Sequence, residues 1–373
     1  MSGISVINPK DFQTSIGRWS GLGPYYAMFP VKFAFDAVQQ YCPEGGAVLD
    51  PFAGRGSSIY AAATTGRYGY GIEINKVGWL YSKVKLSPAP LEGLLSRICE
   101  IEILAKELPD TELEQLPEFF NWCFTKSVLK FLITAQKSLK WQDNIVDATL
   151  MALILVDLHG NRHRSFSNQM RQVKAMAQEY SINWWKANES YPPDIDPAHL
   201  LRKKVDWRYK KGVPQNTGRG HIQLGDSIKH LDDVIQGVEK GTIPQFDLLL
   251  TSPPYYSVTS YYYDQWLRLW MLGEPHTPTK SGGEWQGTFS SKASYETLLR
   301  QVFSKVAQVM KDDSTIFVRT DNRQFTRQIT LTILKEVFPN KSILESESTP
   351  EISQTALYGD KSPKPGEVDI ILK

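Results

Sequence analysis

Residues 47–57 read Ala47-Val-Leu-Asp-Pro-Phe-Ala-Gly-Arg-Gly-Ser57, a short apolar run that enters a turn with two glycines. We expect a buried strand at 47–50 and a helix from Ser57 to Thr65 that Gly66 ends. Glycines at a strand-to-helix turn let the backbone approach a ligand at the carboxyl end of a parallel sheet. A purely structural turn is the alternative. The turn lacks the third glycine of a dinucleotide fingerprint, and the chain has no Gly-x-x-x-x-Gly-Lys-Ser/Thr run, which argues against nicotinamide and nucleoside-triphosphate sites.

Strand and helix signals alternate on both sides of a long middle segment. A second strand is expected at 68–74 and a helix at 76–86. Five further strand candidates and three helices follow, the strands at 221–225, 246–251, 314–319, 342–347 and 368–372, the helices near 228–238, 295–310 and 328–338. This order predicts an α/β fold with a doubly wound, seven-stranded, mainly parallel sheet. The last two strands have no helix between them, so we expect an antiparallel hairpin at one edge.

The middle segment is expected to be helical. Residues 91–209 carry few strand signals, and the apolar stretches at 128–139 and 145–158 predict buried helices. A Gly/Pro/Asn-rich run at 212–218 marks the exit from this segment. We therefore divide the chain into residues 1–86, the first part of an α/β domain, residues 87–217, a helical insert, and residues 218–373, the second part of the domain.

Another apolar strand ends in two consecutive prolines, in Phe246-Asp-Leu-Leu-Leu-Thr-Ser-Pro-Pro-Tyr255. Prolines fix the backbone and donate no hydrogen bonds, so their carbonyls can be aimed at a donor. The exocyclic amine of a nucleobase is such a donor, and the Ser252 hydroxyl and Pro253 carbonyl can draw its nitrogen toward a tetrahedral, nucleophilic geometry. Tyr255 can stack on a base flipped out of a duplex. The alternative is a Pro-Pro turn after a core strand.

Two acidic residues follow other strands of the predicted sheet. Glu73 lies near the end of the second strand, where a carboxylate can accept both hydrogen bonds of a ribose diol. Asp226, in Leu224-Gly-Asp-Ser227, can accept a hydrogen bond from the adenine amino group of a nucleoside-containing cofactor whose ribose is bound by Glu73. The alternatives are a solvated carboxylate for Glu73 and a helix N-cap at Asp226 or Ser227.

Four motifs together resemble those of amino-group DNA methyltransferases of the N4-cytosine/N6-adenine type. They are Asp50-Pro-Phe-Ala-Gly-Arg-Gly56, Gly71-Ile-Glu-Ile-Asn75, Gly225-Asp-Ser227 and Thr251-Ser-Pro-Pro-Tyr255, and Tyr26-Ala-Met-Phe-Pro30 is similar to the family segment before the glycine loop. The Ser-Pro-Pro-Tyr form resembles that of the N4-cytosine members. One departure is that the Gly-Asp-Ser strand follows the insert instead of preceding it.

The resemblance implies a class I methyltransferase fold, Rossmann-like, with S-adenosyl-L-methionine as the cofactor and S-adenosyl-L-homocysteine as its product. It implies that the catalytic residues are Ser252, Pro253, Pro254 and Tyr255. The implied cofactor-binding residues are Phe29, Pro30, Asp50, Pro51, Phe52, Ala53, Gly54, Gly56, Ser57, Glu73, Ile74, Asp226 and Ser227.

The helical insert matches the family only in role, as the region that recognises the DNA target. Residues 161–220 carry 12 Lys or Arg and 5 Asp or Glu, whereas the whole chain has a net charge of only +2. We expect contacts to double-stranded DNA from this basic region; the alternative is a solvated face. The predicted DNA contacts are Tyr256, Arg162, Arg164, Arg202, Lys203, Lys204, Arg208, Lys210 and Lys211.

The expected activity is methyl transfer to the N4 of cytosine in DNA, with base flipping, in a restriction–modification or related role with a cognate endonuclease as a further partner. An N6-adenine DNA methyltransferase and an RNA amino-methyltransferase are the alternatives, and a non-catalytic binding module is disfavoured by the combination of motifs. Cytosine C5 methylation is excluded by resemblance, because the chain has no Pro-Cys dipeptide.

Other features of the chain are expected to be ordinary. The three cysteines have no CxxC spacing, and His159 and His163 are expected to be a surface pair, so no metal is predicted. The first residues lack the pattern of a secretory signal, and no stretch approaches eighteen consecutive apolar residues. We therefore expect a cytoplasmic protein.

Overall fold

The computed structural model describes residues 11–24, 30–256, 261–277, 291–348 and 366–373. Within them, one seven-stranded sheet has the order β3-β2-β1-β4-β5-β7-β6. β7 pairs antiparallel with β5 and β6, and the other pairs are parallel. The prediction of a mainly parallel sheet with an antiparallel edge is confirmed. The strands are β1 (Ala47–Asp50), β2 (Tyr68–Glu73), β3 (Gly220–Leu224), β4 (Phe246–Thr251), β5 (Met310–Asp321), β6 (Ile343–Ser348) and β7 (Glu367–Leu372).

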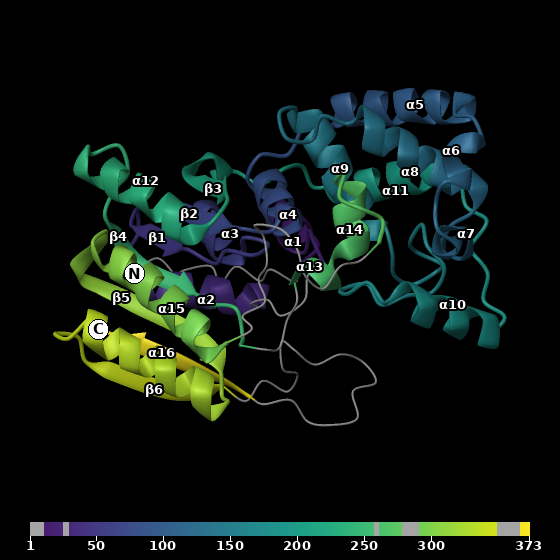
Figure 1. Cartoon of the computed structure of the whole chain (residues 1–373). Helices are drawn as coiled ribbons and strands as arrows, with labels where there is room; N and C mark the ends of the chain where they lie inside the picture. Colours follow the sequence, from purple (N-terminus) through teal and green to yellow (C-terminus); the bar gives the residue numbers. More distant parts are fainter. Residues whose placement is uncertain (1–10, 25–29, 257–260, 278–290, 349–365) are drawn as a thin grey trace.

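Helices cover both faces of the sheet (Figure 1). Side chains of the central strand β4 alternate between two buried clusters: Leu248 and Leu250 face one, and Leu249 faces the other. This alternation follows from the two-residue period of a strand. The first cluster includes α1 (Ser15–Ser20), α2 (Val31–Tyr41), α3 (Ser57–Thr64) and α4 (Lys76–Leu86), and the second includes α12 (Ser227–Glu239), α15 (Lys292–Ala307) and α16 (Gln324–Val337).

The middle segment folds as helices, as predicted, and lies beside the sheet domain (Figure 1). Every residue from Asp147 to Leu155 on its central helix is buried. That burial explains why this helix is apolar on most faces; no described helix is long and apolar enough to cross a membrane. The helices are α5 (Leu91–Glu107), α6 (Thr111–Glu114), α7 (Glu118–Cys123), α8 (Lys126–Ser138), α9 (Ile145–Asp157), α10 (Gln178–Ala187) and α11 (Pro197–Tyr209); the 3-10 turn η1 (Thr217–Arg219) then leads to β3.

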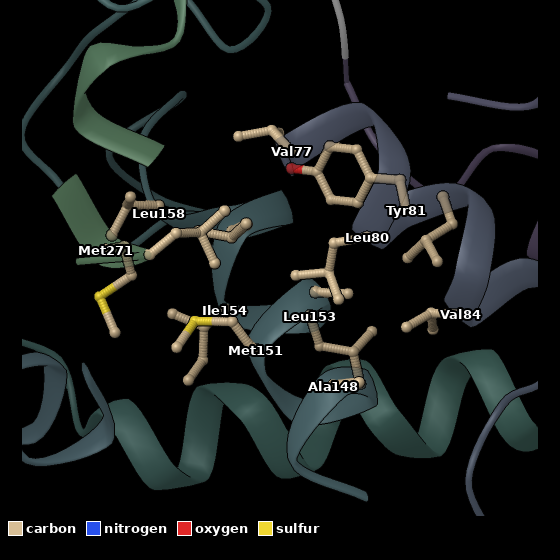
Figure 2. Packing of buried hydrophobic residues seen from close by; sticks show 14 of the residues in the cluster. Val77, Leu80, Tyr81, Val84, Ala148, Met151, Leu153, Ile154, Leu158 and Met271 are labelled. Carbon is tan, nitrogen blue, oxygen red and sulfur yellow. The ribbon is translucent and has the colours of Figure 1, made fainter. Parts of the chain in front are cut away.

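The insert and the sheet domain share one hydrophobic core. Figure 2 shows Leu80 and Val84 of α4 packed against Ala148 and Leu153 of α9. Because the cluster is continuous from the sheet to the insert, we expect the two regions to stabilise each other.

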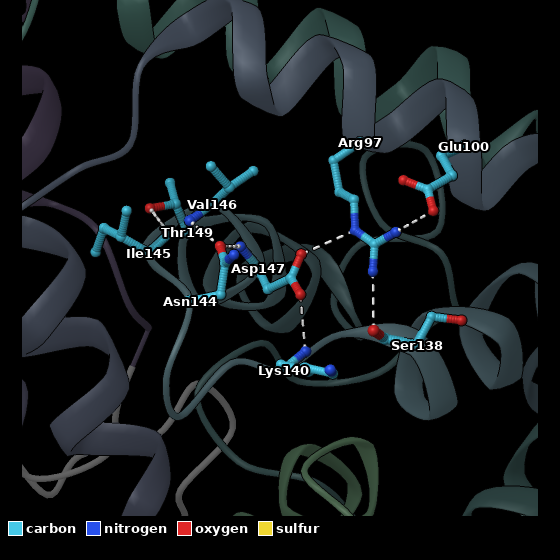
Figure 3. Close-up of polar contacts among 9 residues, drawn as sticks. All are labelled: Arg97, Glu100, Ser138, Lys140, Asn144, Ile145, Val146, Asp147 and Thr149. Atoms are coloured by element: carbon cyan, nitrogen blue, oxygen red, sulfur yellow. Dashed lines mark hydrogen bonds and ion pairs between the residues drawn. The ribbon is translucent and has the colours of Figure 1, made fainter.

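An ion pair between the buried Asp147 and the half-buried Arg97 fixes the start of α9 (Figure 3). The Asn144 side chain caps the helix by accepting from the backbone N–H groups of Val146 and Asp147. The Asp147 carboxylate accepts from Arg97 Nε at 2.8 Å and from the Lys140 backbone at 2.8 Å. Arg97 also donates to the carbonyl of Ser138, so α5, α8 and α9 are held together at one point.

Residues from the second part of the α/β domain also enter the insert. After β4 come α13 (Tyr261–Asp264) and α14 (Trp266–Met271). Arg268 of α14 is fully buried and donates to the carbonyls of Leu155 and Gln172. The segment that follows the Pro-Pro motif is therefore anchored in the helical insert. The division of the chain at residue 217 had assigned these residues to the α/β domain alone.

Candidate functional site

The glycine turn after β1 packs against α4. Gly54 and Gly56 have φ angles of 54° and 70°, which favour glycine. A Cβ on Gly56 would lie 2.5 Å from Ser82 Oγ, so the turn has no room for a side chain there. The turn delivers the chain into α3, as the sequence predicted.

Glu73, at the end of β2, holds this turn from the other side. Its Oε2 accepts from the Gly54 N–H at 2.6 Å, and its Oε1 accepts from the Asn75 N–H at 2.7 Å. Burial raises the pKa of Glu73 to about 7, although both hydrogen bonds oppose the shift. Each carboxylate oxygen still has a lone pair for a further donor. The carboxylate is thus oriented at the strand end and retains acceptor capacity.

Asp50, at the end of β1, joins two loops that are far apart in the sequence. Its Oδ1 accepts from the Thr251 hydroxyl at 2.7 Å and from the Phe52 N–H at 3.1 Å. Its Oδ2 accepts from the Ser58 hydroxyl. Burial raises the pKa of Asp50 to about 6. Because Thr251 directly precedes Ser252, the glycine turn and the Ser-Pro-Pro-Tyr loop meet at one carboxylate.

The loop after β3 reaches the same edge. The Ser227 hydroxyl donates to the Pro51 carbonyl, and the Gly225 N–H donates to the Glu73 carbonyl at 3.0 Å. Asp226 caps α12, because its Oδ1 accepts from the N–H groups of Ile228 and Lys229 at 2.9 and 3.1 Å. The N-cap interpretation of Asp226 therefore describes the geometry.

The other predicted cofactor residues lie around this edge. Ser57 Oγ is buried and has no hydrogen-bond partner among the described residues. This orphaned group and the spare acceptors of Glu73 fit a nucleoside-containing cofactor. Pro51 and Ala53 are buried, Phe52 and Ile74 are half-buried, and Pro30 is exposed at the start of α2. Phe29 lies outside the described residues.

The Ser-Pro-Pro-Tyr loop follows β4 directly. Ser252 and Pro254 are half-buried and Pro253 is buried. Tyr255 is only 4% exposed, and its hydroxyl donates to Oε1 of Glu367 on β7 at 3.4 Å. This hydrogen bond and burial hold the Tyr255 ring inside the protein, so the predicted stacking on a base requires the ring to become accessible.

Tyr256 is half-buried rather than free. Its ring packs against Tyr295 and Phe325, with centroids 5.8 and 5.2 Å away. Its carbonyl accepts from Arg323, whose Nε pairs with Asp321 at 2.9 Å. Arg323, the N-cap residue of α16, thus supports Tyr256, and Glu367 of β7 supports Tyr255. Sequence reasoning missed both, since neither belongs to a recognisable motif.

One residue of the basic run on α11, Arg208, is packed inside the protein and does not face solvent as predicted. Arg208 is 7% exposed, donates to the Arg18 carbonyl and lies 5.5 Å from the centre of the Trp19 ring. Burial lowers its pKa to about 10. A phosphate on the surface cannot reach this side chain, so the prediction of a DNA contact for Arg208 is corrected: it packs α11 against α1.

Two further predicted DNA contacts are already paired within the insert. Arg202 pairs with Glu102, and Lys204 Nζ lies 2.8 Å from Asp157. The remaining predicted residues face solvent wholly or in part, with Arg162 half-buried and the exposed ones being Arg164, Lys203, Lys210 and Lys211.

His159 is also placed differently from the prediction. It is fully buried, with Nδ1 2.7 Å from the Arg171 carbonyl, whereas His163 is exposed. The expectation of a surface pair was therefore wrong for His159. Among the described residues, no group of three or more His, Cys, Asp or Glu side chains could hold a metal ion.

Two solved structures give low similarity scores. TrmN from Thermus thermophilus is 9% identical, with a TM-score of 0.34, over 98% of this chain and 52% of that chain. The rRNA methyltransferase aviRa from Streptomyces viridochromogenes is 11% identical, with a TM-score of 0.36, over 98% of this chain and 93% of that chain. The fold assignment therefore rests on the strand order described above.

Sequence comparison finds similarity to a DNA methylase family and to a type II methyltransferase. The type II methyltransferase M.MvaI of Kocuria varians is 24% identical over 258 residues, which cover 64% of this chain and 53% of that protein. The matched region thus spans about half the length of this relative. Residues 4–78 match the N6/N4 family model described as DNA methylase. The part of the chain that holds the glycine turn and Glu73 thus carries the pattern of the N6/N4 amino-group DNA methylase family.

Proposed function

We propose that this protein is an S-adenosyl-L-methionine-dependent methyltransferase that modifies the exocyclic N4 of cytosine in DNA. The observation that carries the proposal is the Asp50–Thr251 hydrogen bond of 2.7 Å, which brings the glycine turn beside the Ser-Pro-Pro-Tyr loop. A methyl donor at the first loop and a base at the second would face each other there. The family match and the relative named a type II methyltransferase support DNA as the substrate and a restriction–modification role.

The cofactor is proposed to lie across the ends of β1, β2 and β3. Glu73 would accept hydrogen bonds from its ribose hydroxyls through the lone pairs that Gly54 and Asn75 leave unused. Ser57 Oγ, which has no partner among the described residues, would gain one. When bound, the cofactor supplies a methyl group on a positively charged sulfur.

The base is proposed to enter beside Ser252. A nitrogen inside a duplex cannot approach the methyl donor, so the nucleotide must be flipped out. The Ser252 hydroxyl and the Pro253 carbonyl would accept the two hydrogens of the amine and favour a nucleophilic nitrogen. Held in this way, the nitrogen would be positioned to accept the methyl group that the cofactor supplies, and its proton would be lost to solvent after the transfer.

The tyrosines are proposed to support this base. Stacking by Tyr255 requires its ring to leave the buried position in which Glu367 holds it. The rest of the loop is braced by Arg323, which donates to the Tyr256 carbonyl. Chain residues thus supply orientation and hydrogen bonding, and no covalent intermediate with the protein is needed.

Adenine N6 is the second candidate target, because the matched family includes both amino-group chemistries. The choice of cytosine rests on Ser252, the first residue of the Ser-Pro-Pro-Tyr motif. The same pocket chemistry could act on RNA, which is the less favoured alternative.

The decisive experiment incubates the purified protein with isotopically labelled S-adenosylmethionine and unmethylated DNA, followed by mass spectrometry of the nucleosides. The expected product is N4-methylcytosine. Labelled N6-methyladenine would overturn the choice of base. Label in RNA but not in DNA would overturn the substrate class.

A further inference from the structure

A cavity of about 510 Å³ opens on the helical insert, and none of its lining residues belongs to the proposed methyl-transfer site. Its lining residues come from α10 and from residues 169–176. Figure 1 shows α10 at the edge of the insert. Its volume falls in the range of sites that hold small organic ligands. The lining residues that matter for its chemistry are Met170, Arg171, Met176, Tyr180, Trp184 and Trp185.

Aromatic rings give the cavity a stacking surface. Tyr180 and Trp184 are one helical turn apart on α10 and so lie on the same face of the helix, with exposed fractions of 56% and 39%. Trp185 is 1% exposed, and its indole N–H donates to the Gln169 carbonyl at 2.7 Å, which fixes the wall behind them. Exposed rings beside a rigid apolar wall suit a flat, unsaturated ligand such as a nucleobase.

The surroundings of the cavity favour an anionic polymer. Residues 162–186 include five Lys or Arg and one acid, Glu179. Lys174 and Lys186 pair with Asp264 and Glu118 from other parts of the chain, and the other three basic residues are Arg162, Arg164 and Arg171. Arg164 is exposed, and Arg162 is half-buried with a Nε that has no hydrogen-bond partner among the described residues. Cations around an aromatic surface match the phosphates and bases of a nucleic acid.

The cavity wall is tied to the segment that follows the Ser-Pro-Pro-Tyr loop. The Ala175 N–H donates to the Asp264 carbonyl at 2.9 Å, and Lys174 pairs with the Asp264 carboxylate at 2.6 Å. Gln265 and Trp266 donate to the carbonyls of residues 173 and 176, at 3.0 and 3.1 Å. The cavity wall and the segment that follows the Ser-Pro-Pro-Tyr loop are therefore fixed relative to each other.

We propose that this cavity binds an unstacked nucleobase of the DNA, distinct from the base that is methylated. Tyr180 and Trp184 stack on it. Arg171, which lines the cavity, and Arg162, whose backbone N–H donates to the lining residue Gln169, meet the adjoining phosphates. The proposal rests on DNA as the substrate, and it adds a contact by α10 to those expected from the exposed basic residues of α11.

The test measures binding of the full-length protein to a fluorescein-labelled pool of 30-base-pair duplexes of random sequence, over a series of salt concentrations. Tyr180→Ala and Trp184→Ala should each weaken binding roughly five- to 150-fold, the range for loss of one stacked base. Stacking releases no counterions, so the salt dependence should not change. Tyr191→Ala is the matched control, because Tyr191 is 58% exposed in the same insert but does not line the cavity.

A second measurement needs no variant. Ultraviolet cross-linking of bromodeoxyuridine-substituted duplex to the wild-type protein should label peptides from residues 169–185. The proposal would be overturned if the Tyr180→Ala/Trp184→Ala protein bound DNA with the affinity of the wild type. Cross-links found only outside residues 169–185 would also overturn it. If the wild-type protein methylates DNA but the variants bind it unchanged, only the cavity proposal fails. If the wild-type protein neither binds nor methylates DNA, the proposed function fails as well.

Discussion

At the carboxyl edge of the sheet, the motifs predicted from the sequence are joined by hydrogen bonds. Asp50 accepts from Thr251, and Glu73 accepts from Gly54. In the helical insert, the predicted basic residues are scattered, with Arg208 buried while Lys210 is exposed. The difference comes from secondary structure. Parallel strands end at a common edge, whereas successive residues of a helix point in different directions. A motif at a strand end therefore locates a site, and a charge run on a helix does not.

The largest expected effect tests the sheet edge. Ser252→Ala should lower the rate of methyl transfer about 10²- to 10³-fold, the usual effect of removing one group that stabilises a transition state. Cofactor affinity should be unchanged, because Ser252 is proposed to touch only the base. The measurement is single-turnover transfer of labelled methyl beside calorimetric titration of the cofactor. Ser304→Ala, an exposed serine on α15, is the control. Lost cofactor affinity in Ser252→Ala would mean that the two loops have been assigned the wrong roles.

Asp50→Ala should break the junction between the two loops. The substitution leaves buried donors on Phe52, Ser58 and Thr251 without their acceptor. We expect the free energy of unfolding in urea to fall by about 3 kcal/mol, since each unsatisfied buried donor costs roughly 1–3 kcal/mol. Asp312→Ala, at an exposed position on β5, should change it by less than about 0.5 kcal/mol. Equal stability of the Asp50→Ala protein and the wild type would argue against a shared carboxylate.

Glu73 should make cofactor binding depend on pH. Its pKa of about 7 lies above the usual 4.5 because of burial, so its contribution to the stability of the cofactor-free protein is present below pH 4.5 and is lost as the pH rises through 7. Ribose hydroxyls donate to the ionised form, so affinity should instead increase about tenfold between pH 6 and pH 8.

Calorimetric titrations of S-adenosylmethionine across this range provide the measurement. Glu73→Gln should bind more weakly and lose the tenfold dependence. Asp50, with a pKa of about 6, titrates in both proteins, so the difference between them isolates Glu73. A pH profile shared by Glu73→Gln and the wild type would exclude a ribose contact for this carboxylate.

The smallest effects are expected from substitutions of two basic residues of the insert, one buried and one exposed. Arg208→Ala should lower the free energy of unfolding by about 2 kcal/mol through lost packing and a lost hydrogen bond, without altering the salt dependence of DNA binding. Lys210→Ala should leave stability unchanged and reduce the slope of log K against log salt by about 1 if the residue contacts a phosphate. Titrations at several salt concentrations separate the two. An altered salt slope for Arg208→Ala would contradict its structural role.

The sequence by itself was sufficient for the sheet and for the location of its loops. A strand or a glycine turn is specified by neighbouring residues, through a two-residue period, apolar runs and backbone restrictions. For this reason Ala47–Asp50 and Phe246–Thr251 were predicted as strands, and the structure confirms them. Parallel pairing then follows from the intervening helices.

Only the tertiary structure decided which side chains are available. Arg208 continues the buried series Ala198, Leu201 and Val205 on α11, and its burial depends on α1, which lies about 190 residues earlier in the chain. Tyr255 is covered because Glu367, 112 residues later, lies beside it. The helical spacing of the buried series on α11 places Arg208 on the apolar face of that helix, but which distant element covers that face depends on how the elements pack, and no local pattern encodes it.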